Sequence, residues 1–170
     1  MAFDANRADF TVGVIGAGAM GQGIVQVSLQ GGMNVVLFDA KKGSAEAGRE
    51  QVIKRLERLV EKGKLTADAV AAMADKVSVA KSLADFSGCH TVVEAIFENL
   101  EVKQQVFSDL ENHVSADCLL TSNTSSLPIG SIARVCKNPE RVAGFHFFNP
   151  VPLMRLVEVI HGPGTEEWVM

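Results

Sequence analysis

The chain has 170 residues, of which 47% are hydrophobic and 21% are charged; these proportions are usual for one globular domain with its own core. Its formal net charge is −4 at pH 7, and the scattered basic residues give no long-range attraction for phosphodiester backbones or anionic lipids. Nucleic acids and membranes are therefore not expected partners.

The three cysteines, Cys89, Cys118 and Cys136, lie far apart and form no C-x-x-C pair. Their spacing predicts neither a disulfide framework nor a zinc site, so no bound metal is expected. The N-terminal residues lack the basic and then apolar stretches of a signal peptide, and no apolar run approaches the length of a membrane span. We expect a cytoplasmic protein with reduced thiols.

Short apolar runs alternate with longer segments of helical periodicity, which is the pattern of a parallel sheet covered by helices. Strands are predicted at residues 12–15, 35–39, 77–80, 91–95, 119–122, 142–147 and 156–160. Helices are predicted at residues 20–29, 45–61 and 101–113, with a shorter one after Pro128. Asn99 is expected to cap the third of these helices. The alternation predicts an α/β fold with a doubly wound, mostly parallel sheet and helices on both faces.

The end of the chain departs from this pattern. Residues 162–164, Gly-Pro-Gly, form a break, and Thr165 with the two following glutamates resembles the cap and acidic first turn of a new helix. A helix that ends about one turn later, at Met170, is not stable in isolation. We therefore expect one domain at residues 1–164, and at residues 165–170 the start of a helix that leads to a second, helical domain absent from this sequence.

A G-x-G-x-x-G sequence formed by Gly16, Gly18 and Gly21 follows the first predicted strand, and a predicted helix begins within it at Met20. The motif alone is weak evidence, but a strand before it and a helix after it are the setting of a Rossmann dinucleotide site. Gly16 would make the tight turn, Gly18 would let the backbone approach a pyrophosphate, and Gly21 would allow close helix packing. The helix N-terminus would face the phosphates.

Asp39 ends the second predicted strand, about 20 residues downstream, where a carboxylate can accept hydrogen bonds from an adenosine ribose diol. A 2′-phosphate would meet a like charge there, so NAD is favoured over NADP. Lys41 and Lys42 could soften that repulsion, although neighbouring loop lysines are more often a solvated surface pair. A flavin, a methyl donor or a ligand-free turn remain alternatives for the glycine loop.

Two later segments carry the chemistry. Residues 122–127, SNTSSL, follow the fifth predicted strand, and residues 144–152, GFHFFNPVP, precede residues 156–160, LVEVI. Together with GAGAMGQG at residues 16–23, they closely resemble the L-3-hydroxyacyl-CoA dehydrogenase family. The resemblance runs from about residue 11 to residue 160 in the same order, and its HFFNP and LVEV motifs are more specific than a glycine loop.

His146 is the predicted catalytic base, because the polar end of a strand after a nucleotide site lies at the carboxyl edge of the sheet, where ligands bind in open α/β folds. An imidazole there can take a hydroxyl proton as the carbon gives up hydride. His146 and Glu158 are equidistant from Pro152, so in two antiparallel strands they could face each other, roughly 5 Å apart at Cβ. Glu158 would then fix the imidazole tautomer and stabilise the imidazolium.

The resemblance implies roles for further residues. Ser125 would donate a hydrogen bond to the substrate oxygen and contact the cofactor, and Asn149 would contact the nicotinamide ribose or the substrate. Lys62 would approach the coenzyme A phosphates. The remaining cofactor contacts implied by the family are Ala95, Glu98, Lys103 and Asn123. Without the family, Ser125 would be an ordinary loop serine or cap, and Lys62 a solvent-facing lysine.

The resemblance implies NAD-dependent oxidation of an L-3-hydroxyacyl-CoA to the 3-oxoacyl-CoA. Its further implications are an acyl-CoA substrate, a helical C-terminal domain that closes over the acyl chain, and a homodimer of the full-length protein. Because closure excludes water and positions the substrate, this chain alone is expected to bind NAD but to turn over substrate feebly if at all. The face meant for the second domain would be exposed and somewhat apolar.

Two other functions compete with this one. A non-catalytic dinucleotide-binding or structural homologue would need only the glycines and Asp39, so the presence of His146, Glu158, Ser125 and Asn149 argues against it. A related dehydrogenase that uses a lysine base on a 3-hydroxy acid would not call for the histidine and glutamate pair.

Overall fold

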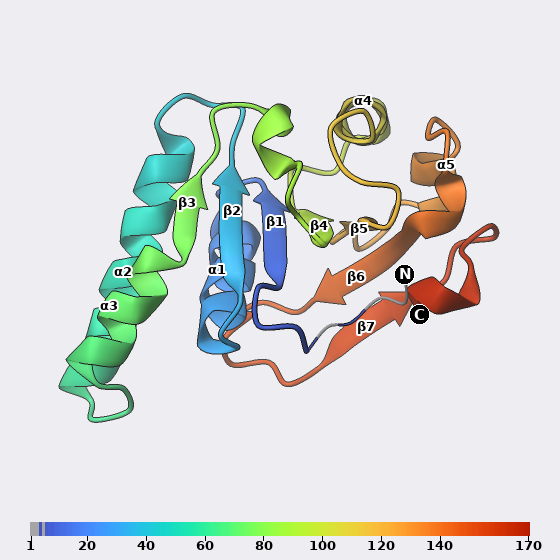
Figure 1. The fold of residues 1–170 in the computed structure, drawn as a ribbon. Coiled ribbons are helices and arrows are strands. Elements are labelled where there is room, and N and C mark those ends of the chain that lie inside the picture. Colours follow the sequence, from blue (N-terminus) through green and yellow to red (C-terminus); the bar gives the residue numbers. More distant parts are fainter. Residues whose placement is uncertain (1–3, 5) are drawn as a thin grey trace.

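The computed structural model describes residue 4 and residues 6–170, and its centre is a seven-stranded sheet with the order β3-β2-β1-β4-β5-β6-β7. Neighbouring strands are parallel except β6 and β7, which are antiparallel. The strands are β1 (Thr11–Ile15), β2 (Asn34–Phe38), β3 (Val77–Val79), β4 (Thr91–Glu94), β5 (Leu119–Ser122), β6 (Val142–Phe147) and β7 (Val157–Ile160). The predicted doubly wound fold with a final antiparallel strand is confirmed (Figure 1).

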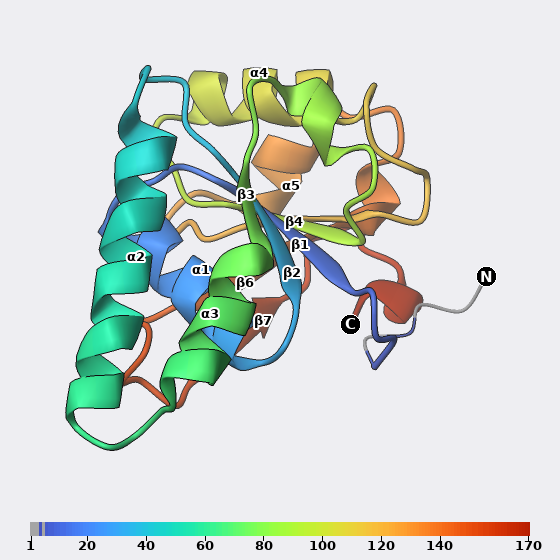
Figure 2. The same cartoon turned by 60° about the vertical axis from the view of Figure 1, so that its left-hand side comes forward.

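Helices cover both faces of the sheet, as predicted (Figure 2). The helices are α1 (Ala19–Gln30), α2 (Ser44–Glu61), α3 (Ala67–Asp75), α4 (Leu100–Leu110) and α5 (Ile129–Ala133), with short 3-10 turns η1 (Leu83–Phe86), η2 (Pro139–Arg141) and η3 (Glu167–Val169). One core cluster joins α1, α2 and α3 to the sheet, and a second joins α4 and α5 to the opposite face. The central strands β4 and β5 are buried throughout, as expected of parallel strands covered on both sides.

Local sequence accounts for the helix boundaries. The Asn99 side chain accepts a hydrogen bond from the Val102 amide at 3.0 Å, so the predicted cap of α4 is confirmed. α4 ends at Leu110, three residues before its predicted end. α3 was not among the predicted helices. Only Val70 is buried in it, and its alanine-rich sequence holds few large apolar residues to indicate a packed face.

The end of the chain differs from the prediction. Residues 167–169 form the 3-10 turn η3 rather than the first turn of an α-helix, and the Thr165 hydroxyl does not cap it. This hydroxyl donates to the Val142 carbonyl at 2.6 Å and accepts from the Gly162 amide at 2.9 Å. Thr165 therefore anchors the turn after β7 to β6, and Val169 packs on the sheet beside Leu119.

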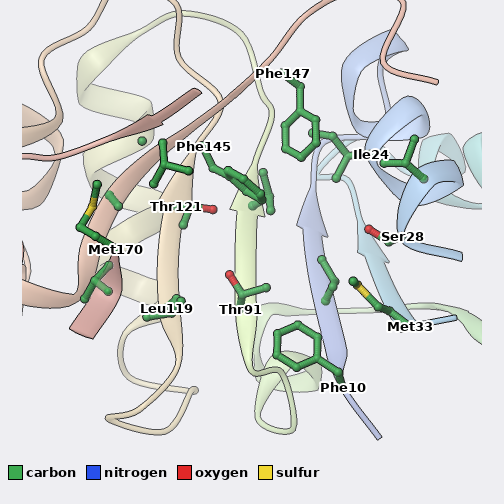
Figure 3. A pocket seen from close by; sticks show the side chains of 17 residues that line it. Phe10, Ile24, Ser28, Met33, Thr91, Leu119, Thr121, Phe145, Phe147 and Met170 are labelled. Atoms are coloured by element: carbon green, nitrogen blue, oxygen red, sulfur yellow. The ribbon is translucent and has the colours of Figure 1, made fainter. Parts of the chain in front are cut away.

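A cavity of about 370 Å³ lies on one face of the sheet beside α1, over β4, β5 and β6 (Figure 3). Its walls are mostly apolar, and they include Phe10, Leu119, Phe145, Phe147 and Met170. Figure 3 shows these side chains converging on the open space between α1 and the later strands.

Within the described residues, no helix is both long and apolar enough to cross a membrane.

Candidate functional site

The glycine loop joins β1 to α1 in a conformation that requires glycine. Gly16 has φ of +106°, which is unfavourable for other residues, and a Cβ there would lie 2.6 Å from the Ala95 carbonyl oxygen. A Cβ at Gly21 would lie 1.8 Å from the Gly16 carbonyl oxygen, whereas one at Gly18 would meet no atom within 4 Å. Gly16 and Gly21 are therefore needed for packing, and Gly18 leaves open space above the loop.

Two further features of this loop fit an anionic ligand. α1 has no side-chain cap on its Gly18 N-cap among the described residues and no acidic residue in its first turn, which includes Met20. Its first amides and its positive dipole end are therefore available to phosphates. The loop fits the pyrophosphate of a dinucleotide.

Asp39 follows β2 directly and turns its carboxylate toward the glycine loop. One oxygen accepts from the Ala17 amide at 2.8 Å and the other from the Lys41 amide at 2.8 Å. The negative charge is thereby fixed beside the loop, whereas the side chains of Lys41 and Lys42 are exposed. This arrangement fits a ribose diol better than a 2′-phosphate.

His146 and Glu158 are directly opposite each other in the register of β6 and β7, and the His146 Nδ1 lies 2.9 Å from a Glu158 carboxylate oxygen. The predicted facing of these two residues is confirmed. Because an ionised carboxylate only accepts hydrogen bonds, Nδ1 is the donor and Nε2 of the neutral ring is the acceptor. The Ser125 hydroxyl, 3.0 Å from Nε2, therefore donates to it.

The three side chains form a linear chain of hydrogen bonds from Ser125 through His146 to Glu158. The His146 side chain is 16% exposed and that of Glu158 is 50% exposed, so the group is open to a ligand. Phe145 and Phe147 line the cavity of Figure 3, and alternation along β6 therefore directs His146 to the other face of the sheet. The apolar cavity beside α1 and this polar group are on opposite sides of one strand.

Asn123 holds the ends of three strands together. Its amide donates to the Glu94 carbonyl at 2.8 Å, and its side-chain oxygen accepts from the Phe147 amide at 2.8 Å. Asn123 thus links β5 to β4 and β6 next to His146. Its side-chain oxygen is engaged with the backbone of β6.

Glu98 and Lys103, both expected beside the cofactor, lie in different environments. Glu98 is 40% exposed, whereas the Lys103 side chain is 1% exposed and its Nζ lies 2.6 Å from Glu94 and 3.2 Å from Glu98. Burial raises the pKa of Glu98, but hydrogen bonds from Thr124 and the Ser125 amide and the charge of Lys103 outweigh it and hold this pKa below its ordinary value. The Lys103 ammonium is enclosed by carboxylates rather than presented to a ligand.

Glu94 was missed as a candidate. It is the last residue of β4, and it is 1% exposed. The signal was a carboxylate next to the end of the mostly apolar predicted strand 91–95, because ionised residues are almost never fully buried unless they are paired.

Three candidates remain: Ala95, Asn149 and Lys62. Ala95 follows β4, donates from its amide to the Ile15 carbonyl at 2.7 Å, and abuts Gly16. Asn149 is exposed just beyond β6, joined to Pro150 by a cis peptide bond. Lys62 is exposed at the C-cap of α2, about 27 Å along that helix from its first residue. The structure does not bring Lys62 into contact with the His146 group.

Comparison with known proteins gives a consistent set of relatives. Residues 11–170 match the family described as 3-hydroxyacyl-CoA dehydrogenase, NAD binding domain. A "probable 3-hydroxybutyryl-CoA dehydrogenase" of Deinococcus radiodurans is 46% identical over 155 residues, which are 91% of this chain and 55% of that protein. A Bacillus subtilis protein of the same description is 44% identical over 154 residues, which are 91% of this chain and 54% of that protein.

Solved structures agree with these relatives. The crystal structure of 3-hydroxybutyryl-CoA dehydrogenase from Escherichia coli superposes with a TM-score of 0.91 at 40% identity, covering 95% of this chain and 34% of that one. The chain spans about half the length of the first curated relatives it matches. The NAD cofactor favoured by Asp39 agrees with the family description. Because the family match covers nearly the whole chain, this protein belongs to the family of 3-hydroxyacyl-CoA dehydrogenase NAD-binding domains.

Proposed function

We propose that this chain is the NAD-binding and proton-transferring part of an enzyme that oxidises an L-3-hydroxyacyl-CoA to the 3-oxoacyl-CoA. The observation that carries the proposal is the hydrogen-bonded chain from Ser125 through His146 to Glu158. A base, an orienting carboxylate and a hydroxyl donor are the groups that oxidation of an alcohol requires beside a nicotinamide. They lie at the carboxyl edge of the sheet, where ligands bind in this fold.

The residues of the glycine loop fit the cofactor. Gly18 and the first turn of α1 would hold the pyrophosphate, and Asp39 would accept from the adenosine ribose. Ala95, which abuts Gly16, and Glu98, which follows β4, would also contact the cofactor. When bound, NAD supplies a hydride acceptor for the carbon that carries the hydroxyl group.

His146 would accept the substrate's hydroxyl proton at Nε2, the ring nitrogen that lies 3.0 Å from the Ser125 hydroxyl. Glu158 would keep the Nδ1 proton in place and stabilise the imidazolium formed by the transfer. The Ser125 hydroxyl would then be free to donate to the substrate oxygen, and Asn149 would contact the substrate or the nicotinamide ribose. In the reverse direction His146 returns the proton to the oxygen.

The partners follow from the part of the relatives that this chain does not span. We propose that a further domain covers the open side of the His146 group and completes the acyl-CoA site, with Lys62 near the coenzyme A phosphates, and that the full-length protein is a homodimer. Three large apolar side chains near the site support a covering partner, because they are exposed by more than half: Phe97 (68%), Leu153 (77%) and Leu156 (55%).

The test separates binding from turnover. NADH is titrated calorimetrically into this chain, and NADH oxidation by acetoacetyl-CoA is assayed with this chain and with a longer form that includes the remaining length of the relatives. We expect NADH binding by the chain, feeble turnover by the chain, and rapid turnover by the longer form. Absence of NADH binding would overturn the proposal.

Two variants sharpen the test. In the longer form, His146→Gln should lower kcat about 100-fold or more, since general base catalysis contributes roughly 10² to 10⁴, while NADH affinity changes less than about twofold. His161→Gln replaces an exposed histidine near the end of β7 and should change neither value. Equal turnover by the two variants would show that His146 is not the base.

A further inference from the structure

The pair formed by Lys103 and Glu94 is the most deeply buried pair of opposite charges near the site. Both side chains are 1% exposed, and Nζ lies 2.6 Å from a Glu94 oxygen. Removing two charges from water is expensive, and such pairs are often no more stabilising than apolar residues of the same volume. Stability alone is therefore a weak reason for this pair, and its other contacts indicate what it does.

Glu94 connects the pair to the end of β5. Its second oxygen accepts from the Ser122 hydroxyl at 2.7 Å, and the oxygen that contacts Lys103 also accepts from the Ile96 amide at 2.7 Å. The Ser122 hydroxyl in turn accepts from the Thr124 amide at 3.2 Å. The buried carboxylate thus fixes the first residues of the loop that carries Ser125.

Lys103 connects the same pair to Thr124 and Ser125 of that loop. Its Nζ lies 3.2 Å from Glu98. The other Glu98 oxygen accepts from the Thr124 hydroxyl at 2.8 Å and from the Ser125 amide at 2.8 Å. These contacts form a closed ring that runs from Ser122 through Glu94, Lys103, Glu98 and Thr124 back to Ser122. Ser125 is joined to the ring by its amide, and its hydroxyl lies against His146.

We propose that Glu94 and Lys103 are positioning residues that act through Glu98 to hold the Ser125 amide, and with it the Ser125 hydroxyl, against His146. Lys103 acts from inside the protein, because its side chain is 1% exposed and its Nζ contacts only Glu94 and Glu98 among the ion pairs of the described residues. The inference deepens the proposed function, on which it rests for the importance of the Ser125 hydroxyl. It gives the buried pair a role in the geometry of the site.

The charges in the ring predict a measurable signature. Glu98 is contacted by Lys103 of α4 and by Thr124 and Ser125 of the loop after β5, and Glu94 of β4 contacts the same Lys103 ammonium. Because the ammonium favours the ionised form of Glu98, its removal should raise the pKa of Glu98 toward or above the ordinary range. The chemical shift of the Ser125 amide should follow the titration of Glu98, because this amide donates to the Glu98 carboxylate.

The experiment follows the Ser125 amide by NMR as the pH is lowered, in the chain without cofactor. We expect the midpoint of the pH-dependent change in the Ser125 amide chemical shift to lie about one pH unit higher in Lys103→Met than in the parent chain, a roughly tenfold change in acidity. We also expect hydrogen exchange of this amide with solvent to become at least tenfold faster. The midpoint should vanish in Glu98→Gln, which accepts from the amide but does not titrate. Glu101→Gln, an exposed change in the first turn of α4, should leave it unchanged.

A second variant covers the case in which Lys103→Met does not fold. The double change Glu94→Gln with Lys103→Met leaves no unpaired buried charge, and it should also raise the Ser125 midpoint and speed its exchange. An unchanged midpoint and exchange rate in a folded variant without Lys103 would overturn the inference. The same holds if such a variant loses NADH affinity in a salt-dependent way while the Ser125 amide is unaffected, because Lys103 would then act on the cofactor. Since the NMR readout needs no NADH, failure of the proposed function would not be confused with failure of the inference.

Discussion

Gly23 of α1 and Val151, in the turn between β6 and β7, are in such close contact that a Cβ at Gly23 would lie 2.7 Å from the Val151 Cβ. Val151 is 5% exposed and belongs to the core cluster of α1. The helix that follows the glycine loop therefore supports the turn that joins His146 to Glu158. The cofactor half and the proton-transfer half of the site share one packing contact.

Gly23→Ala should destabilise the chain, because it overfills this contact. Overpacking typically costs about 1–3 kcal/mol, and α1 and the turn would have to separate to relieve it. Adding Val151→Ala should restore part of the loss. Urea denaturation of the two single variants and of the double variant measures the coupling, and strictly additive losses would show that the contact is not limiting.

Asp39→Asn should weaken NADH binding by on the order of tenfold, because a neutral amide accepts hydrogen bonds less strongly than a carboxylate. It should improve the affinity for NADPH relative to NADH, since the like charge beside the 2′-phosphate is removed. Calorimetric titration with both nucleotides measures the ratio. Asp68→Asn, an equal charge change on exposed α3, is the control, and an equal effect there would refute the role of Asp39.

Val159→Lys should make this chain less prone to self-association. Val159 is 49% exposed and lines the cavity beside α1, and apolar surfaces of this kind drive association. Met154→Lys replaces a side chain that is 43% exposed and lies outside the cavity, so it should have little effect. Sedimentation velocity measures the monomer fraction, and equal association of both variants would contradict the prediction.

The three thiols should lower stability at alkaline pH. Burial raises the pKa of Cys89 to about 12, of Cys118 to about 12 and of Cys136 to about 11, whereas thiols of the unfolded chain ionise near pH 8.5. Above that pH the unfolded state binds fewer protons, so the free energy of unfolding falls as the pH rises, by up to about 2 kcal/mol per thiol between pH 7 and pH 10.

Urea denaturation at these two pH values checks the prediction. The variant with all three cysteines replaced by alanine is the comparison, and the chain has no tyrosine to add its own titration in this range. A loss of stability as large in the variant as in the parent chain would assign the effect to other groups.

Much of this site could be predicted from the sequence. The facing of His146 and Glu158 followed from their equal distance from Pro152 and from the two-residue period of a strand, and the register confirms it. The glycine loop followed from its place between a strand and a helix. These features depend on residues that are close together in the sequence, and hydrophobic periodicity indicates such local structure directly.

Contacts across the fold could not be predicted in this way. The burial of Lys103 depends on the distance between α4 and the end of β4, and the engagement of Thr165 with Val142 depends on how the last turn folds back on β6. Neither leaves a periodic signal. A lysine near a helix start and a threonine before two glutamates have the same sequence whether they are exposed or enclosed.

β6 separates a polar environment from an apolar one. The His146 imidazole lies on one side of the strand, and on the other side Phe145 and Phe147 line the apolar cavity. A segment that packs against those two rings also fixes the backbone of β6, and so the direction in which the His146 side chain points. Packing on the apolar side of this strand therefore affects the acid–base chemistry on the polar side.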